Sequence, residues 1–386
     1  MTQISIAATT DVHGFLDEGL TALPVSLENI SADLLLDNGD FFVGSPFAAY
    51  AYDQQKISPL VTIANDLAYD VMVPGNHDLD FGLAWLQRQV SELKADYVCA
   101  NLKDAQGVDI FPAYTIKDIR GLKVAVIGLM TAAFNQLSSR EVVEEVIVIN
   151  PFDALRDTLT HLKSETNCDL TVVCYHGGLT NDPVTGATWF YPSLEDQAYQ
   201  LMTTFPEIDS LMCGHQHFTN AGIHPQQIAC LQVGTRAHVL GYQRFDITNG
   251  QTQIIDNKLL PLQEQATTYP LGAEGGAYRA WLGQTIEHSA IKTYLKNRYP
   301  ADYYVLPFSA NTLEALLSDL AIPFPLSYYY LPGKAFSQFL DVDDKQAIAS
   351  EEFYTVLAIT GQLPQTRLRE GLLIPLFDDI IKHKAY

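Results

Sequence analysis

Five short segments of the sequence combine histidine, carboxylate and amide side chains at close spacing. In chain order they are Asp11-Val12-His13, Gly39-Asp40, Gly75-Asn76-His77-Asp78-Leu79-Asp80, His176-Gly177-Gly178 and Gly214-His215-Gln216-His217. Such polar groups are costly to bury without partners. Neutral imidazole together with carboxylate oxygen suits Mn²⁺, Zn²⁺, Fe or Co²⁺. The pattern therefore predicts a metal site that needs no cysteine.

Each segment taken alone also has an ordinary explanation. A single Asp-x-His pair is a common hydrogen-bonded loop, Gly39-Asp40 is a turn, and a lone His176 says little. Five such segments in order, each behind an apolar run, favour the metal site, because the ordinary explanation would need five independent coincidences. The remaining histidines lack this context and are expected at the surface or in the core: His161, His224, His238, His288 and His383.

An apolar, strand-like run precedes each of the five segments. The runs are residues 4–8, 32–36, 71–73, 170–174 and 208–213, and helical stretches are expected at 60–67, 83–93, 151–162 and 194–205. Strands alternating with helices predict a layered α/β fold. Consecutive strands expected at 229–233 and 239–247 indicate some antiparallel pairing.

The strand ends should bring the five segments together. Ligands of open α/β sheets bind at the carboxyl ends of the strands, so the polar segments are expected at one such edge. Asp11 and His13 are two residues apart, as are His215 and His217. On extended backbone this spacing would put both side chains of a pair on the same side. The glycine beside nearly every candidate ligand fits backbone that turns sharply.

Length and composition suggest two domains and limit the partners. The chain has 386 residues, and a stretch rich in glycine, threonine and glutamine near residues 262–276 reads as a linker between residues 1–262 and 263–386. A net charge of −22 argues against a nucleic-acid polymer or an anionic membrane as partner. No apolar run approaches the ~20 residues of a membrane span. The first strand begins almost at Met1, which leaves no room for a signal peptide and predicts a cytoplasmic protein.

The five cysteines are an odd number without Cys-x-x-Cys spacing: Cys99, Cys168, Cys174, Cys213 and Cys230. Because most of them lie in apolar runs, buried free thiols are expected in preference to a disulfide framework.

The five segments resemble the motif series of the calcineurin-like metallophosphoesterases. Thr10-Asp11-Val12-His13-Gly14 and the segment from Gly75 to Asp80 are most similar to the 5'-nucleotidase and 2',3'-cyclic phosphodiesterase branch. The resemblance covers about residues 1 to 260. It implies a four-layer α/β/β/α sandwich, followed by a second, smaller α+β domain that shortens the C-terminal domain of that branch.

The resemblance also implies roles for individual residues. One metal would be held by Asp11, His13, Asp40 and His217, and the other by Asp40, Asn76, His176 and His215, so that Asp40 bridges the two. A hydroxide bridging the metals would attack phosphorus in line. His77, oriented and kept charged by Asp80, would bind no metal and would stabilise the transition state.

The function implied is hydrolysis of a small phosphoester, with a nucleotide as substrate and a role in nucleotide catabolism. Two alternatives stay open: a cyclic-nucleotide phosphodiesterase or a nucleotide-sugar or dinucleotide pyrophosphatase, and an inactive metal-binding scaffold. The metals could be Mn, Zn, Fe or Co, and the oligomeric state is open.

The substrate-binding residues are not assigned. The arginine segment expected in the second domain is replaced by residues 307–313. Tyr328, Tyr329, Tyr330 and Phe336 could stack on a base but fit core packing better, and Arg279, Arg298 and Lys334 fit a solvated surface better than a phosphate contact.

Overall fold

The computed structural model describes residues 2–16, 18–138, 140–248, 250–262, 271 and 274–284, and the backbone of four later strands. The chain divides into two compact units, Met1–Asn135 with Arg140–Pro270, and Gln136–Ser139 with Leu271–Tyr386. The predicted domain boundary after residue 262 stays a prediction, because residues 263–270 lie outside the described part. No helix in the described part of the chain is long and apolar enough to cross a membrane.

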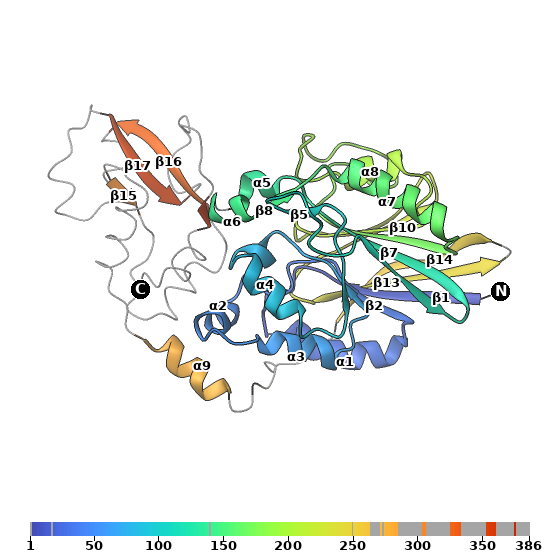
Figure 1. Ribbon diagram of the computed structural model, residues 1–386, viewed down its shortest axis with the longest axis horizontal. Coiled ribbons are helices and arrows are strands. Elements are labelled where there is room, and N and C mark those ends of the chain that lie inside the picture. The colour runs from blue at the N-terminus through green and yellow to red at the C-terminus, as the bar shows by residue number, and fades with distance from the viewer. Residues whose placement is uncertain are drawn as a thin grey trace. The chain divides into compact units, whose positions relative to one another are not determined.

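Two six-stranded sheets form the centre of the first unit (Figure 1). The first sheet has the order β14-β13-β1-β2-β3-β4. Its strands are β1 (Thr2–Thr9), β2 (Leu34–Asp37), β3 (Val71–Met72), β4 (Asp96–Tyr97), β13 (Val239–Thr248) and β14 (Gln251–Pro261). Strands β1 to β4 run parallel, whereas β13 is antiparallel to both of its neighbours. The antiparallel pairing expected late in the chain is therefore confirmed.

The second sheet has the order β11-β12-β10-β9-β7-β6. Its strands are β6 (Tyr114–Ile119), β7 (Leu122–Met130), β9 (Leu170–His176), β10 (Ser210–Cys213), β11 (Thr219–His224) and β12 (Ile228–Val233). The four central strands are parallel and the two edge strands antiparallel. A separate pair is formed by β5 (Leu102–Asp104) and β8 (Val146–Val148).

The two sheets face each other across one apolar core. Ile6 and Leu36 of the first sheet belong to the same buried cluster as Val126 and Val172 of the second. Burial on both faces explains why these strands are nearly continuous apolar runs.

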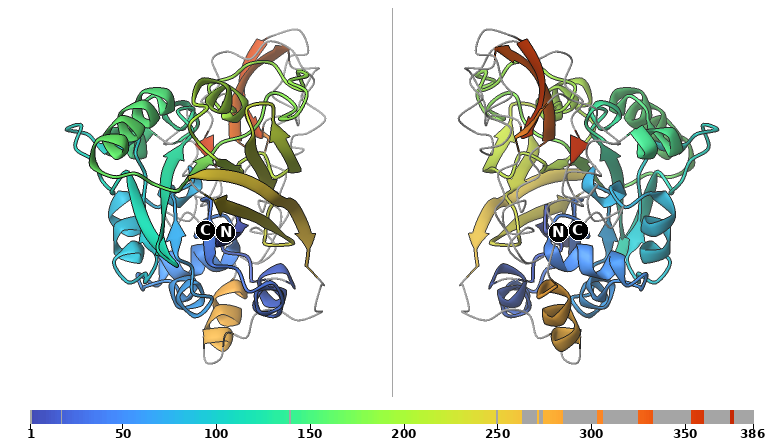
Figure 2. Two further views of the ribbon diagram at one scale, coloured as in Figure 1. Left: turned by 90° about the vertical axis from the view of Figure 1, so that its right-hand side faces the viewer. Right: turned by 90° about the vertical axis from the view of Figure 1, so that its left-hand side faces the viewer.

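Helices cover the outer faces of both sheets. On the second sheet lie α7 (Pro151–Glu165) and α8 (Ala198–Thr204), whose Leu155 and Leu201 pack into a second buried cluster. The first sheet is flanked by α1 (Glu18–Ile30), α2 (Pro46–Asp53), α3 (Pro59–Asp66) and α4 (Leu83–Val90). Two short helices, α5 (Phe134–Leu137) and α6 (Arg140–Glu145), follow β7. The predicted four-layer α/β/β/α sandwich is confirmed, and Figure 2 shows its layers from two sides.

Helix α7 shows how local sequence sets an element's start. The Asn150 side chain accepts a hydrogen bond from the Phe152 N–H at 2.8 Å, and Pro151 occupies the first helical position. This cap satisfies a backbone donor that the first turn leaves without a partner. The helix start predicted at Pro151 is confirmed.

The second unit combines a helix with a sheet. Helix α9 spans Glu274–Leu282. The sheet has the order β15-β17-β16-β18, formed by β15 (Tyr303–Val305), β16 (Pro325–Pro332), β17 (Phe353–Ile359) and β18 (Ile374–Pro375). The side chains of Tyr328, Tyr329, Tyr330, Phe336, Arg298 and Lys334 lie outside the described part of the structure.

Candidate metal centre

The five polar segments meet at the carboxyl ends of parallel strands. They follow β1, β2 and β3 in the first sheet and β9 and β10 in the second. Six of the side chains form two groups whose ligand atoms lie within 4.8 Å of one another: Asp11, His13 and His217 in the first group, and Asp40, His176 and His215 in the second. The edge expected from the sequence thus gathers side chains up to two hundred residues apart.

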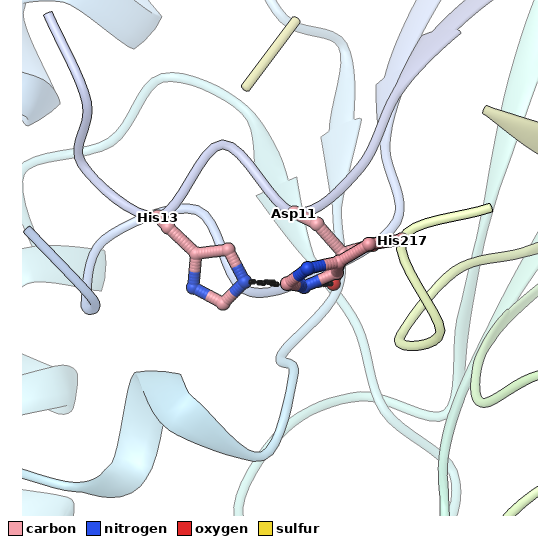
Figure 3. Close-up of side chains that lie close together, drawn as sticks. All are labelled: Asp11, His13 and His217. Carbon is pink, nitrogen blue, oxygen red and sulfur yellow. Dashed lines mark hydrogen bonds and ion pairs between the residues drawn. The ribbon is translucent and has the colours of Figure 1, made fainter. Parts of the chain in front are cut away.

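The first group places two imidazoles and a carboxylate around one point (Figure 3). His217 Nε2 lies 3.4 Å and His13 Nε2 lies 3.7 Å from Asp11 Oδ1. The two Nε2 atoms are 3.0 Å apart. Because His13 Nδ1 faces the Val43 carbonyl at 2.8 Å, its proton is held there and Nε2 presents a lone pair. A cation placed between these atoms could be bound by all three side chains.

Asp40 connects the first group with the second. Its Oδ2 lies 3.2 Å from His176 Nε2 in the second group and 3.8 Å from His13 Nε2 in the first. Its Oδ1 accepts a hydrogen bond from the His77 N–H at 2.8 Å. One carboxylate oxygen therefore faces both groups while the other is fixed to the backbone.

Two buried atoms at the site lack the partner that burial demands. Asn76 Oδ1 and His176 Nε2 are shielded from solvent and make no well-formed hydrogen bond, although His176 Nε2 lies 3.2 Å from Asp40 Oδ2. His176 is held by its other nitrogen, since Nδ1 faces the Asn38 carbonyl at 2.8 Å. Metal-bound histidines are characteristically oriented in this way. The orphaned oxygen and nitrogen, with the carboxylates beside them, fit a pair of divalent cations.

The charges of the buried ligands depend on one another. Burial lowers the pKa of His13 to about 4, although Asp40 and Asp11 act in the opposite direction, so its ring is neutral. Burial also lowers the pKa of His176, but Asp40 outweighs it and raises that pKa to about 10. In turn His176, and then His77, hold the pKa of Asp40 well below its usual range against the effect of burial. Asp40 is therefore an anion, as a metal ligand must be.

The backbone at the ligands is not extended, so that part of the sequence analysis is wrong. Asp11 and His13 have φ of 53° and 54°, and His215 and His217 have φ of 69° and 60°. Asp40 likewise has φ of 55°. All five lie in the left-handed region, where non-glycine residues are uncommon and are found at functional sites. The two side chains of each pair converge because the loops turn through left-handed residues. The alternation of side chains along an extended strand does not account for it.

Close approach explains some of the glycines better than turning does. Gly39 has φ of 96° and does turn the chain. Gly75, in contrast, has no positive φ, but a Cβ there would lie 2.1 Å from Asp40 Oδ1. At Gly214 a Cβ would lie 2.2 Å from Thr10 Oγ1. The lack of a side chain at Gly75 and Gly214 therefore allows the loops of the site to pack closely against each other.

His77 lies beside the metal groups without belonging to either. It begins a short 3-10 helix, η1 (His77–Leu79), and its Nδ1 lies 2.6 Å from Asp80 Oδ2. Its ring centroid is 5.5 Å from that of His13. Asp78 points the other way, and its buried carboxylate accepts hydrogen bonds from Phe42 N at 2.8 Å and from Gly75 N at 3.0 Å. Asp78 thus ties the loops together.

Glu195, which was not predicted to lie at the site, has its Oε1 2.8 Å from His215 Nε2. This contact engages Nε2, one of the two ring nitrogens of His215. The hydrogen bond from His215 outweighs burial and lowers the pKa of Glu195. No motif surrounds Glu195, so no local pattern points to it.

Arg236 was also missed. Its peptide N–H donates to the Asp11 carbonyl at 2.8 Å, and its guanidinium lies 3.7 Å above the ring of Phe15. Arg236 is the first lysine or arginine after residues 164–235, which contain neither, and this isolation is the signal in the sequence that could have pointed to it.

Outside the site, the cysteines and other histidines occupy ordinary positions. All five cysteines are free thiols, four of them buried and Cys168 half-buried, which confirms the expectation. His161 is exposed and His224 is buried, while His288 and His383 lie outside the described residues.

Comparison with known proteins identifies the family. The family model described as calcineurin-like phosphoesterase matches residues 4–218. The chain therefore belongs to the calcineurin-like phosphoesterases, a class of hydrolases.

Relatives with assigned names are nucleotide phosphoesterases. The trifunctional nucleotide phosphoesterase YfkN of Bacillus subtilis is 26% identical over 64% of this chain and 18% of its own length. A 2',3'-cyclic-nucleotide 2'-phosphodiesterase/3'-nucleotidase of Yersinia enterocolitica is 26% identical over 62% of this chain and 40% of its own length. A 5'-nucleotidase of Vibrio parahaemolyticus is 31% identical over 46% of this chain and 33% of its own length. The chain spans less than half the length of these relatives.

Solved structures share the fold over nearly the whole chain. One from Staphylococcus aureus, provisionally named a 5'-nucleotidase, has a TM-score of 0.73 at 19% identity and covers 99% of this chain and 96% of its own. A 5'-nucleotidase precursor of Thermus thermophilus has a TM-score of 0.63 at 14% identity and covers 100% of this chain and 97% of its own. At these identities the likeness shows the fold.

Proposed function

We propose that this chain hydrolyses a phosphoester of a small molecule, that it uses two divalent cations, and that its substrate is a nucleotide. The observation that carries the proposal is the position of Asp40. One of its oxygens lies 3.2 Å from a histidine of the second ligand group and 3.8 Å from a histidine of the first. A carboxylate shared in this way can hold two closely spaced cations of the kind that hydrolyse phosphoesters.

The cations would be held by the residues that the structure gathers. Asp11, His13, Asp40 and His217 would hold one, and Asp40, Asn76, His176 and His215 the other. Bound there, the cations would supply an acidified water and neutralise phosphoryl charge. The mixed nitrogen and oxygen donors suit Mn, Zn, Fe or Co and favour none of these metals over the others.

The contribution of the protein's own groups centres on His77. Its Nδ1 contacts Asp80 at 2.6 Å, and the side chain of Asp80 is 5% exposed. A buried carboxylate at this distance fixes the orientation of the ring. The His77 side chain is 22% exposed, so a phosphoryl group can reach it. His77 would stabilise charge on the phosphoryl oxygens and would protonate the leaving oxygen.

The names of the relatives support a nucleotide as substrate. They include a 5'-nucleotidase and a cyclic-nucleotide phosphodiesterase, so a monoester and a cyclic diester are both candidates, as is a nucleotide-sugar or dinucleotide pyrophosphate. The inactive scaffold is disfavoured because it has no use for the His77–Asp80 pair, which holds no metal.

The test is hydrolysis together with metal content. We expect turnover of bis-p-nitrophenyl phosphate with Mn²⁺, two metal ions per chain by mass spectrometry, and preferential hydrolysis of one member of a panel of nucleoside monoesters, cyclic diesters and pyrophosphates. Asp40→Asn should lose both metal and turnover. Asp70→Asn is a matched control, because Asp70 bonds the Leu35 N–H at 2.8 Å at the opposite end of the sheet.

Two results would contradict the proposal. Two bound metals with no hydrolysis of any ester would make the chain a scaffold. Failure of the folded protein to bind metal would remove the basis of the assignment altogether.

A further inference from the structure

Four exposed aromatic side chains lie on chain segments next to residues of the metal centre. Trp189, Phe190, Tyr191 and Phe218, which we call the aromatic patch, are 41%, 44%, 93% and 54% exposed. Among the side chains that the structure describes, they include every large aromatic in the exposed class. Exposed aromatic surface gathered at one place marks a binding site.

The patch is attached to the segments that carry the metal ligands. Phe218 directly follows His217 in the chain. The N–H groups of Trp189 and Phe190 both donate to the carbonyl of Thr180, at 2.9 and 3.1 Å, and Thr180 lies four residues after His176. The patch is therefore built onto the rim of the site.

A second attachment holds the other end of the same loop. Glu195 contacts His215 through its side chain at 2.8 Å. Its backbone carbonyl accepts a hydrogen bond from Thr131 Oγ1 at 2.9 Å. The aromatic residues thus lie between two anchored points, so their rings are positioned by the metal loops.

The rings of Phe190 and Phe218 are stacked and nearly parallel. Their centroids are 6.0 Å apart and their planes differ by 10°. A planar group between the two rings would need about 7 Å, two contact gaps of about 3.5 Å. A ligand would therefore stack on an outer face of the pair.

Charge decides what kind of ligand the patch can bind. Residues 164–235 contain no lysine or arginine, so the segments that carry the patch offer no cation of their own to a nucleic-acid backbone, a lipid phosphate or an acidic peptide. A neutral flat ring suits it, because aromatic side chains stack on any base through its π face. The anionic part of the same ligand would be taken by the cations.

We infer that the aromatic patch binds the base of a nucleotide whose phosphate lies at the metal centre. This inference rests on the proposed function and deepens it. It places the base subsite on the catalytic unit, at Phe190 and Phe218, and it predicts that the enzyme distinguishes esters by their aromatic group.

The test compares AMP with ribose 5-phosphate, which share the phosphoester and differ in the base. The double variant Phe190→Leu/Phe218→Leu keeps apolar volume and removes both rings. We expect its KM for AMP to rise by about 5- to 150-fold, the range measured when bases lose a stacking partner. Its KM for ribose 5-phosphate and kcat for both esters should stay within twofold. Leu194→Ala, a change of exposed apolar surface in the same loop, should leave all these constants unchanged.

Adenosine binding, observed by saturation-transfer NMR, gives a readout without chemistry. We expect transfer to the adenine protons in the parent protein and its loss in the double variant. If AMP and ribose 5-phosphate are hydrolysed with the parent constants by the double variant, the inference is wrong and the proposed function stands. If neither ester is hydrolysed by the parent protein, the proposed function fails for these substrates, and the adenosine signal alone decides the inference. A changed oligomeric state with an unchanged adenosine signal would make the patch a protein contact and overturn the inference.

Discussion

Replacing His77 by alanine should abolish most turnover while leaving both metal ions bound. His77 belongs to neither ligand group, and its contact with Asp80 at 2.6 Å fixes it beside them. A general acid contributes about 10²- to 10⁴-fold to rate, so kcat should fall within that range. KM should change little, because the interaction strengthens only in the transition state.

Asp80→Asn separates the charge of the pair from its geometry. Asparagine keeps the size and an acceptor oxygen at the position, which is 5% exposed, but removes the negative charge. A hydrogen bond to a charged group is worth about 1.5–3 kcal/mol, equivalent to about 10- to 150-fold in rate. The double variant should be no slower than His77→Ala, because Asp80 acts only through His77.

The assay is steady-state hydrolysis with metal content measured on the same samples. Two metal ions per chain must be found in each variant for the comparison to hold. Loss of metal in His77→Ala would make His77 a ligand. An Asp80→Asn effect that persists in the His77→Ala background would show that Asp80 acts on something else, and either result would refute the reasoning.

Four further expectations follow from individual contacts. Glu195→Gln should weaken metal affinity or activity by about 10- to 100-fold, since it orients His215 at 2.8 Å; metal titration checks this, and an unchanged affinity would make the contact incidental. Gly75→Ala should lower Tm by about 2–12 °C, because its Cβ would lie 2.1 Å from an Asp40 oxygen, whereas the control Gly276→Ala has nothing within 4 Å and should not. Removal of the metal by a chelator should lower the free energy of unfolding of the wild-type protein by about 2.7 kcal/mol, the stabilisation that a ligand gives at a hundredfold its Kd, and the loss should appear as a lower Tm. A thiol reagent should label one cysteine of the native protein, the half-buried Cys168, and all five only after unfolding, since the other four thiols are buried.

The sequence was sufficient to predict the strands of the first unit and the edge at which they end. Apolar runs such as 4–8 and 170–174 are buried on both faces, and this continuous apolar character marks them as central strands. Edge strands β6, β11 and β14 were not predicted, because one of their faces is exposed and their composition is mixed. Helix α1 was not predicted either, and Pro24 lies inside it.

At the site, residue types were easier to predict than backbone. The histidines and carboxylates converge as their strand-end positions suggested, but the contact between Glu195 and His215 depends on a loop that no local pattern specifies. The orienting carbonyls of Val43 and Asn38 are backbone atoms, which any residue would supply. The metal roles, the domain boundary and the cytoplasmic location stay predictions.

The left-handed backbone at the ligands links the sequence to the chemistry. Asp11, His13, Asp40, His215 and His217 all have φ between 53° and 69°, a conformation that costs about 1–2 kcal/mol for a residue with a Cβ. Aspartate and histidine tolerate it better than most residues. Left-handed backbone after three strands, β1, β2 and β10, helps to bring carboxylates and imidazoles into two groups whose ligand atoms lie within 4.8 Å of one another. The same turns concentrate like-charged and lone-pair-bearing atoms, such as the two Nε2 atoms 3.0 Å apart. Divalent cations would relieve both costs at once, and for that reason we expect the strain and the metals to be inseparable parts of one site.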